Sequence, residues 1–222
     1  MKQQSIESTG RIKFLSTSKG FGFISQENGL DIYFNIRNLQ NNVEVGDEVI
    51  FLIESKNDRQ SASAIRKVYR NRYGIAFYER INTTHTHLDI EEYLPEVVSN
   101  ISNTNLGFME IEHDFGNYVG LNDCVETSES DDLIYAIRKG RKGYTVFVKN
   151  RYPIPTSYVT IVLKKADNNA YVIITAFYGQ KAGLEPHDPR ATQSDIHFWK
   201  NHALVYNENE IIKESLTNMS PY

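Results

Sequence analysis

Two phenylalanines separated by a single glycine form the segment of the sequence with the clearest chemistry. Residues 19–24 read KGFGFI, so aromatic and small residues alternate after a lysine. In a strand, successive side chains point to opposite faces, which places Phe21 and Phe23 on one face. The two glycines are expected to keep the opposite side of the backbone slim and closely approachable. Aromatic rings beside a cation bind single-stranded nucleic acid by base stacking, at about 1–3 kcal/mol per base, so the segment predicts a stacking surface.

Two neighbouring segments carry side chains of the same kind. Residues 31–36 read DIYFNI, and residues 11–15 read RIKFL just before a Ser-Thr-Ser turn. Alternation in the first of these places its tyrosine and its asparagine on one face. The predicted nucleic-acid-binding residues are therefore Lys13, Phe14, Lys19, Phe21, Phe23, Tyr33 and Asn35.

Residues 10–68 resemble the bacterial cold-shock domain, a five-stranded OB-type barrel that binds single-stranded RNA or DNA. Residues 19–24 match the first RNA-binding motif of that family, and residues 32–36 match the second loosely. Residues 45–51 and 62–68 look like its fourth and fifth strands. The tryptophan usual on the first strand is Phe14 here, and the histidine and phenylalanine that end the second motif are Asn35 and Ile36. The resemblance implies a weaker stacking surface than that of a full member; the alternative is a barrel whose aromatic side chains only fill space.

Length and charge indicate a second domain of a different character. The chain has 222 residues, more than one such barrel needs, so a further domain of about 100–130 residues is expected. Residues 1–70 contain ten lysines and arginines against eight acids, whereas residues 71–222 contain 14 against 20. So small a positive charge on the barrel favours binding by stacking over binding by counterion release.

Other features of the composition bear on location and on redox chemistry. The single cysteine, Cys124, excludes an internal disulfide framework and a multi-thiolate zinc site, and is expected to be a small buried residue. The first residues lack an apolar signal core, and no window approaches the ~20 apolar residues of a membrane span. The sequence therefore predicts a cytoplasmic protein with no membrane contact.

The elements expected after the barrel form an α+β domain with a mostly antiparallel sheet. We expect a barrel domain at 1–70, a connector and helix at 71–104, the α+β domain at 105–206 and a tail at 207–222. The expected helix covers 88–101 with Asp89 as its N-cap, and residues 108–113 and 118–121 are expected to form a hairpin. A short helix is predicted at 133–137, and another in the tail. Strands are predicted at 144–149, 158–164 and 171–177, with either a strand or a helix at 198–206.

A basic stretch is the densest feature of this second half. Six cations fall within residues 138–151, around two glycines that would let a backbone approach a phosphate closely. An ordinary solvated turn is the alternative. A strand at 171–177 that ends in polar residues adds Thr175 and Tyr178 as hydroxyls that could contact a phosphate, although β-propensity alone also accounts for the threonine.

Residues 85–180 resemble, through short motifs, the barnase/EndoU/RelE-like toxin ribonucleases, which cleave RNA without a metal. The resemblance implies a histidine for proton transfer and cations that stabilise the phosphorane. The candidate catalytic residues are His113, Arg141, Lys142, Thr175 and Tyr178, with His85, His87, His187 and His202 as alternative histidines. No cofactor is expected.

Two other segments are candidate sites. The string His85-x-His87-x-Asp89 could open a metal site, but a helix-capping loop with exposed histidines is the preferred interpretation. The loop at 185–190 brings acid, base and cation together and is restricted by two prolines, which suits a loop over a site or an ordinary surface crossing.

These patterns support two functions. The first is a single-stranded RNA-binding protein with a C-terminal, metal-independent endoribonuclease domain. The alternative is a non-catalytic RNA-binding regulator or chaperone whose C-terminal domain mediates oligomerisation or partner binding. The expected partners are single-stranded RNA or DNA, together with a protein inhibitor or a second copy of the chain.

Overall fold

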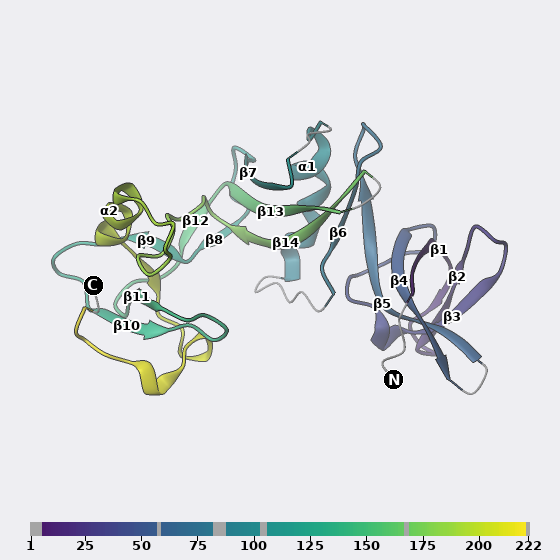
Figure 1. Ribbon diagram of the computed structural model, residues 1–222, viewed down its shortest axis with the longest axis horizontal. Coiled ribbons are helices and arrows are strands. Elements are labelled where there is room, and N and C mark those ends of the chain that lie inside the picture. The colour runs from purple at the N-terminus through teal and green to yellow at the C-terminus, as the bar shows by residue number, and fades with distance from the viewer. Residues whose placement is uncertain (1–5, 57–58, 82–87, 103–105, 167–168, 221–222) are drawn as a thin grey trace. The chain divides into compact units, whose positions relative to one another are not determined.

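The computed structural model describes residues 6–56, 59–81, 88–102, 106–166 and 169–220 (Figure 1). The chain divides into two compact units. Unit 1 contains residues 1–111 and 161–177, and unit 2 contains residues 112–160 and 178–222. Within the described residues, no helix is both long enough and apolar enough to cross a membrane.

Unit 1 begins with a closed five-stranded barrel. Its strand order is β3-β2-β1-β4-β5, and a parallel pairing of β3 with β5 closes the ring. The barrel is filled by alternating inward residues such as Ile12, Ile24, Phe34, Phe51 and Ile65, all essentially buried. This confirms the predicted OB-type barrel. Its strands are β1 (Ile6–Ser16), β2 (Phe21–Ser25), β3 (Asp31–Asn35), β4 (Glu48–Lys56) and β5 (Arg59–Arg70).

Strand β5 leaves the barrel and continues unit 1 into a second stretch of sheet (Figure 1). There it pairs with β6 (Ala76–Glu79), which pairs in parallel with β14 (Ala170–Tyr178). Strands β13 (Tyr158–Ala166) and β7 (Phe108–Asp114) complete the order. The division between the units falls within β7, β13 and β14.

One short helical segment packs on β5 in unit 1. The 3-10 turn η2 (Leu88–Glu92) leads into α1 (Leu94–Ser99), so the predicted helix at 88–101 is two shorter pieces. Tyr93 occupies the N-cap of α1, and the side chain of Asp89 lies outside the described part of the chain. Asn71 donates from Nδ2 to the carbonyls of Val98 (3.0 Å) and Ile101 (2.7 Å), which satisfies groups that the helix end leaves open.

Unit 2 is built on a small mixed sheet. Strands β10 (Leu133–Ile137) and β11 (Tyr144–Val148) form a hairpin, followed in the sheet by β15 (His202–Val205) and β9 (Cys124–Glu126). Helix α2 (Gln193–Asn201) covers it through Trp199. A separate ribbon pairs β8 (Gly120–Asn122) with β12 (Ile154–Thr156). Outside the barrel the described chain is therefore mostly sheet with few helices, as the predicted fold class requires.

Three local predictions in the second half are wrong. Residues 133–137 form strand β10 and not a helix, since their burial alternates and each residue pairs with one on β11. The predicted hairpin at 108–121 does not form, because β7 pairs with β13 whereas β8 pairs with β12. The tail contains two 3-10 turns, η3 (Glu208–Glu210) and η4 (Lys213–Ser215), in place of a helix.

Candidate nucleic-acid interface

Four aromatic rings from three strands meet on one outer face of the barrel, and we call them the ring cluster: Phe14, Phe21, Phe23 and Tyr33. The centroid of Phe21 lies 5.8 Å from Phe14, 5.9 Å from Phe23 and 6.0 Å from Tyr33. Phe14 is 44% exposed and Tyr33 is 42% exposed. Register explains the meeting, because Phe23 pairs with Phe14 on one side and with Tyr33 on the other.

A bulge in β1 gives Phe14 its outward direction. In a regular strand Phe14 would share the inward face of Ile12, which is buried in the barrel. The pairing of β1 with β2 shifts register between Ile12 and Phe14. An extra residue in one strand reverses the facing of the residues after it, so both Lys13 and Phe14 are exposed.

The glycines of β2 serve the barrel and not a ligand. Gly22 is buried, and a Cβ added there would lie 2.3 Å from Cζ of Phe34 and 2.5 Å from the carbonyl oxygen of Phe14. The core ring of Phe34 therefore fills the space below Gly22. Gly20 has φ +77°, a left-handed conformation that glycine adopts without strain, and it ends the turn before β2. The expectation of a closely approachable backbone is corrected by this packing.

The charges around the ring cluster are few and partly neutralised. Lys13 forms an ion pair of 2.6 Å with Asp31, whereas Lys19 is exposed and pairs with no other described residue. Asn35 accepts a hydrogen bond from the backbone N–H of Arg37 at 3.0 Å, so its side-chain oxygen caps the 3-10 turn η1 (Ile36–Asn38). Arg37, which directly follows the second motif, is also exposed and is not among the predicted binding residues.

The two predicted catalytic hydroxyls on β14 do not share a face of the strand. Thr175 is exposed and Tyr178 is buried, and alternation places these two side chains on opposite faces of the strand. The ring of Tyr178 covers Gly120, where an added Cβ would lie 2.5 Å from it. His113 in unit 2 packs edge-on against Phe115, with ring centroids 4.6 Å apart.

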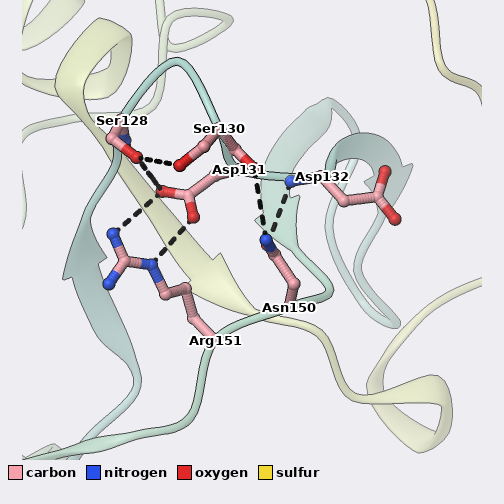
Figure 2. A network of polar contacts seen from close by, with 6 residues as sticks. All are labelled: Ser128, Ser130, Asp131, Asp132, Asn150 and Arg151. Carbon is pink, nitrogen blue, oxygen red and sulfur yellow. Dashed lines mark hydrogen bonds and ion pairs between the residues drawn. The ribbon is translucent and has the colours of Figure 1, made fainter.

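Arg151, at the end of the basic stretch, holds the base of the β10–β11 hairpin (Figure 2). Its guanidinium donates to both carboxylate oxygens of Asp131, at 2.8 and 3.1 Å. Asp131 also accepts from the backbone N–H of Ser128, and Asn150 accepts from that of Asp132. The hydrogen bond from Arg151 is the main cause that lowers the pKa of Asp131. The network joins the loop before β10 to the loop after β11, which is a structural role.

The other five cations of the stretch fall into two groups: three interact with other residues, and two are exposed. Arg138 pairs with Glu185, Lys139 donates to the carbonyl of Asn209 at 2.7 Å, and the ammonium of Lys149 lies 5.9 Å from the ring centre of Tyr206. Arg141 and Lys142 remain exposed at the tip of the hairpin and pair with no other described residue. The basic loop therefore lies between two strands and presents two free cations, not six.

The alternative histidines differ in how they are held. The imidazole of His187 lies over Gly143, and His202 stacks on Phe198 with centroids 4.0 Å apart while its Nδ1 donates to the Phe198 carbonyl at 3.0 Å. His85 and His87 lie outside the described residues. Among the residues that are described, no three His, Cys, Asp or Glu side chains are grouped as a metal site would require. Burial raises the pKa of Cys124 to about 11, in keeping with a small packed residue.

A closed five-stranded barrel with aromatic rings on one outer face defines the class of small OB-type ligand-binding barrels. Residues 8–68 match the family model described as the 'Cold-shock' DNA-binding domain. The major cold shock proteins of Streptococcus pyogenes serotype M18 (strain MGAS8232) and serotype M1 are each 36% identical over 63 residues, which is 27% of this chain and 94% of the relative. Through this segment the chain belongs to the cold-shock domain family.

Proposed function

We propose that the barrel binds single-stranded nucleic acid by stacking bases on the ring cluster. The observation that carries the proposal is the outward gathering of four rings, with centroids 5.8–6.5 Å apart, on a barrel whose interior is already filled. Rings that only filled space would be buried, whereas Phe14 and Tyr33 are more than 40% exposed. A contiguous exposed apolar patch of this kind marks a binding surface.

The chemistry of the patch favours unpaired bases over a duplex. Stacking needs the flat face of a base, which a duplex keeps within its own stack. Lys19 and Arg37 are exposed cations of the barrel that can serve phosphates, while Lys13 is paired with Asp31. Few phosphate contacts imply a shallow dependence of affinity on salt.

Fluorescence anisotropy with a labelled single-stranded oligonucleotide tests the proposal. We expect the full chain to bind it, and an unlabelled single strand to compete far better than the matched duplex. Phe23→Ala should weaken binding about 5- to 160-fold, since one stacked base contributes about 1–3 kcal/mol. Tyr152→Ala, which removes an 86% exposed aromatic of unit 2, serves as the control and should leave binding unchanged. Equal affinity of Phe23→Ala and the unaltered chain would refute the proposal.

For the chain as a whole, the geometry supports the non-catalytic RNA-binding regulator or chaperone better than the endoribonuclease. Thr175 and Tyr178 face opposite sides of β14, which speaks against a single site that uses both hydroxyls. Endoribonuclease activity is kept as a second candidate because Arg141 and Lys142 are exposed in the turn that carries the contact with His187. Incubation of single-stranded RNA with the chain in EDTA separates the two functions. Intact RNA at high protein concentration supports the regulator, and cleavage supports the endoribonuclease.

A further inference from the structure

A glycine without a backbone reason points to a second site, in unit 2. Gly143 is not among the glycines with positive φ, so its conformation does not require glycine. A Cβ added there would lie 2.0 Å from Cγ, 2.2 Å from Nδ1 and 2.3 Å from Cδ2 of His187. The face of the imidazole therefore rests directly on Gly143. Because Gly143 has no side chain, the imidazole of His187 can pack directly on it, and we call this position the seat of His187.

Two further side chains hold the same imidazole in place. Oε2 of Glu185 lies 3.4 Å from Nδ1 of His187, and the other carboxylate oxygen of Glu185 receives Arg138. Glu185 is 12% exposed and Arg138 is 28% exposed, so this ion pair is largely enclosed. A carboxylate at Nδ1 orients a histidine and leaves Nε2 for another partner. The side chain of His187 is 32% exposed, so solutes can reach it.

The seat lies in the turn that presents the two free cations. Lys142 directly precedes Gly143, at about 3.8 Å between Cα atoms, and Arg141 precedes Lys142. Both side chains are exposed and pair with no other described residue. The arrangement combines a planar fork donor, a mobile ammonium and an imidazole, which suits the oxygens of a phosphate.

The two acids of the loop that carries His187 are already engaged. Glu185 faces Arg138 as well as His187, and Asp188 receives both Nε and Nη2 of Arg190, at 3.0 and 2.8 Å. The Arg190 hydrogen bond is the main cause that lowers the pKa of Asp188 to about 2. Since each carboxylate has its own arginine, the positive charge of Arg141 and Lys142 is left for a ligand.

We propose that His187, Arg141 and Lys142 form a binding site for a phosphate group on unit 2, seated on Gly143 and separate from the ring cluster of the barrel. The phosphate could belong to a nucleic-acid backbone or be free phosphate, because both present the same oxygens. The site does not depend on the barrel binding bases.

Imidazole resonances of the full chain, labelled with 15N-histidine and titrated with inorganic phosphate, test the proposal. We expect saturable shifts of the His187 resonance, and none for His197, an exposed histidine of α2. Arg141→Gln and Lys142→Gln should each weaken phosphate binding about two- to fivefold, the range of an exposed ion pair. Lys200→Gln, an equal loss of charge on α2, should leave it unchanged. Gly143→Ala should abolish the His187 shift, with circular dichroism to confirm the fold.

Two results would overturn the proposal. One is a His187 resonance that inorganic phosphate does not move, and the other is a loss in Lys200→Gln as large as that in Arg141→Gln, which would indicate net charge alone. A second titration, with a single-stranded oligonucleotide on the Phe21→Ala/Phe23→Ala variant, identifies the source of the phosphate. A His187 shift with the oligonucleotide assigns the site to a nucleic-acid backbone, and a shift with inorganic phosphate only assigns it to free phosphate.

Discussion

The ring cluster of the barrel and the basic stretch of unit 2 have opposite fates in the folded protein. All four predicted aromatic side chains of the barrel gather on one outer face. Of the six predicted cations, four are used in ion pairs, a hydrogen bond to a carbonyl or a contact with an aromatic ring. Local alternation directs Phe21, Phe23 and Tyr33 outward, whereas a charged side chain can pair with any acid or carbonyl that the fold brings near.

The two regions differ in what keeps a side chain available to a ligand. Phe21 and Phe23 stay outside because their neighbours on β2, Gly22 and Ile24, face the filled barrel core. Arg151 is lost to ligands because Asp131, twenty residues earlier in the chain, lies opposite it in the fold. The first outcome depends on two adjacent positions and the second on the tertiary structure.

The largest effect should come from removing the centre of the ring cluster. Phe21→Ala/Phe23→Ala removes two stacking rings and should cost about 2–6 kcal/mol of single-strand binding. Arg141→Gln/Lys142→Gln should weaken single-strand binding less than tenfold, because these cations are on the other unit and contribute at most a phosphate contact. Anisotropy titrations of both variants at one salt concentration provide the comparison. If the cation variant lost as much affinity as the ring variant, the contrast between the two regions would be wrong.

The next largest effect is expected from Gly22, the glycine of β2 between Phe21 and Phe23. Gly22→Ala forces a methyl group against Phe34 and the Phe14 carbonyl, and overpacking of this kind costs about 1–3 kcal/mol of unfolding free energy. Urea unfolding followed by circular dichroism measures the cost. Gly107→Ala is the matched control, since an added Cβ there meets nothing within 4 Å. Equal stability of the two variants would mean that the barrel core tolerates a side chain at position 22.

The same contrast explains how far the sequence predicts the molecule. The barrel strands are predictable because inward and outward residues alternate over short distances, although the bulge that turns Phe14 outward needs the structure. Residues 133–137 are mistaken for a helix because five apolar residues after acids are too few to show a period, and only pairing with β11 decides them. Thr175 and Tyr178 of the candidate catalytic set do not share a face, as their three-residue spacing on one strand already implies.

A smaller effect is expected from an ion pair between β4 and β5. Arg70 donates to Glu48, at 2.8 Å from Nε to Oε2, and this hydrogen bond is the main cause that lowers the pKa of Glu48. Because the folded pKa lies below the ordinary value, ionised Glu48 stabilises the fold above that value and the contribution disappears as the pH falls through the folded pKa. Glu48→Gln should therefore cost about 0.5–1 kcal/mol at pH 7, reduced by the half-exposed position of Arg70, and less at pH 3.

Urea unfolding at several pH values measures this dependence. Glu27→Gln, on an exposed turn with no ion pair to another described residue, is the control and should follow the unaltered chain at every pH. A cost of Glu48→Gln that stays constant from pH 7 to pH 3 would assign the loss to packing and not to charge.

In unit 2, the paired and the free arginines of the basic stretch should behave differently. Arg151→Gln breaks both hydrogen bonds to Asp131 and should speed amide exchange at Asp132 and Lys149, whose N–H groups bond within the same pair of loops. Arg141→Gln removes an exposed side chain at the other end of the hairpin and should leave that exchange unchanged. Hydrogen exchange measured by NMR distinguishes them. Similar exchange in both variants would remove the distinction between structural and available cations.

The smallest expected effect is a gain of binding, in the barrel. Asp31→Asn removes the partner of Lys13 and leaves its ammonium free to meet a phosphate beside the ring cluster. Single-strand affinity should rise about two- to fivefold, and the slope of log K against log salt should steepen by about 0.7, the value for one more contact on a single strand. Lys13→Gln in the same background should return both quantities to those of the unaltered chain. A gain that survives Lys13→Gln would show that Asp31 repels the strand directly, and the balance of stacking and charge on this face would then depend on its acids as much as on its rings.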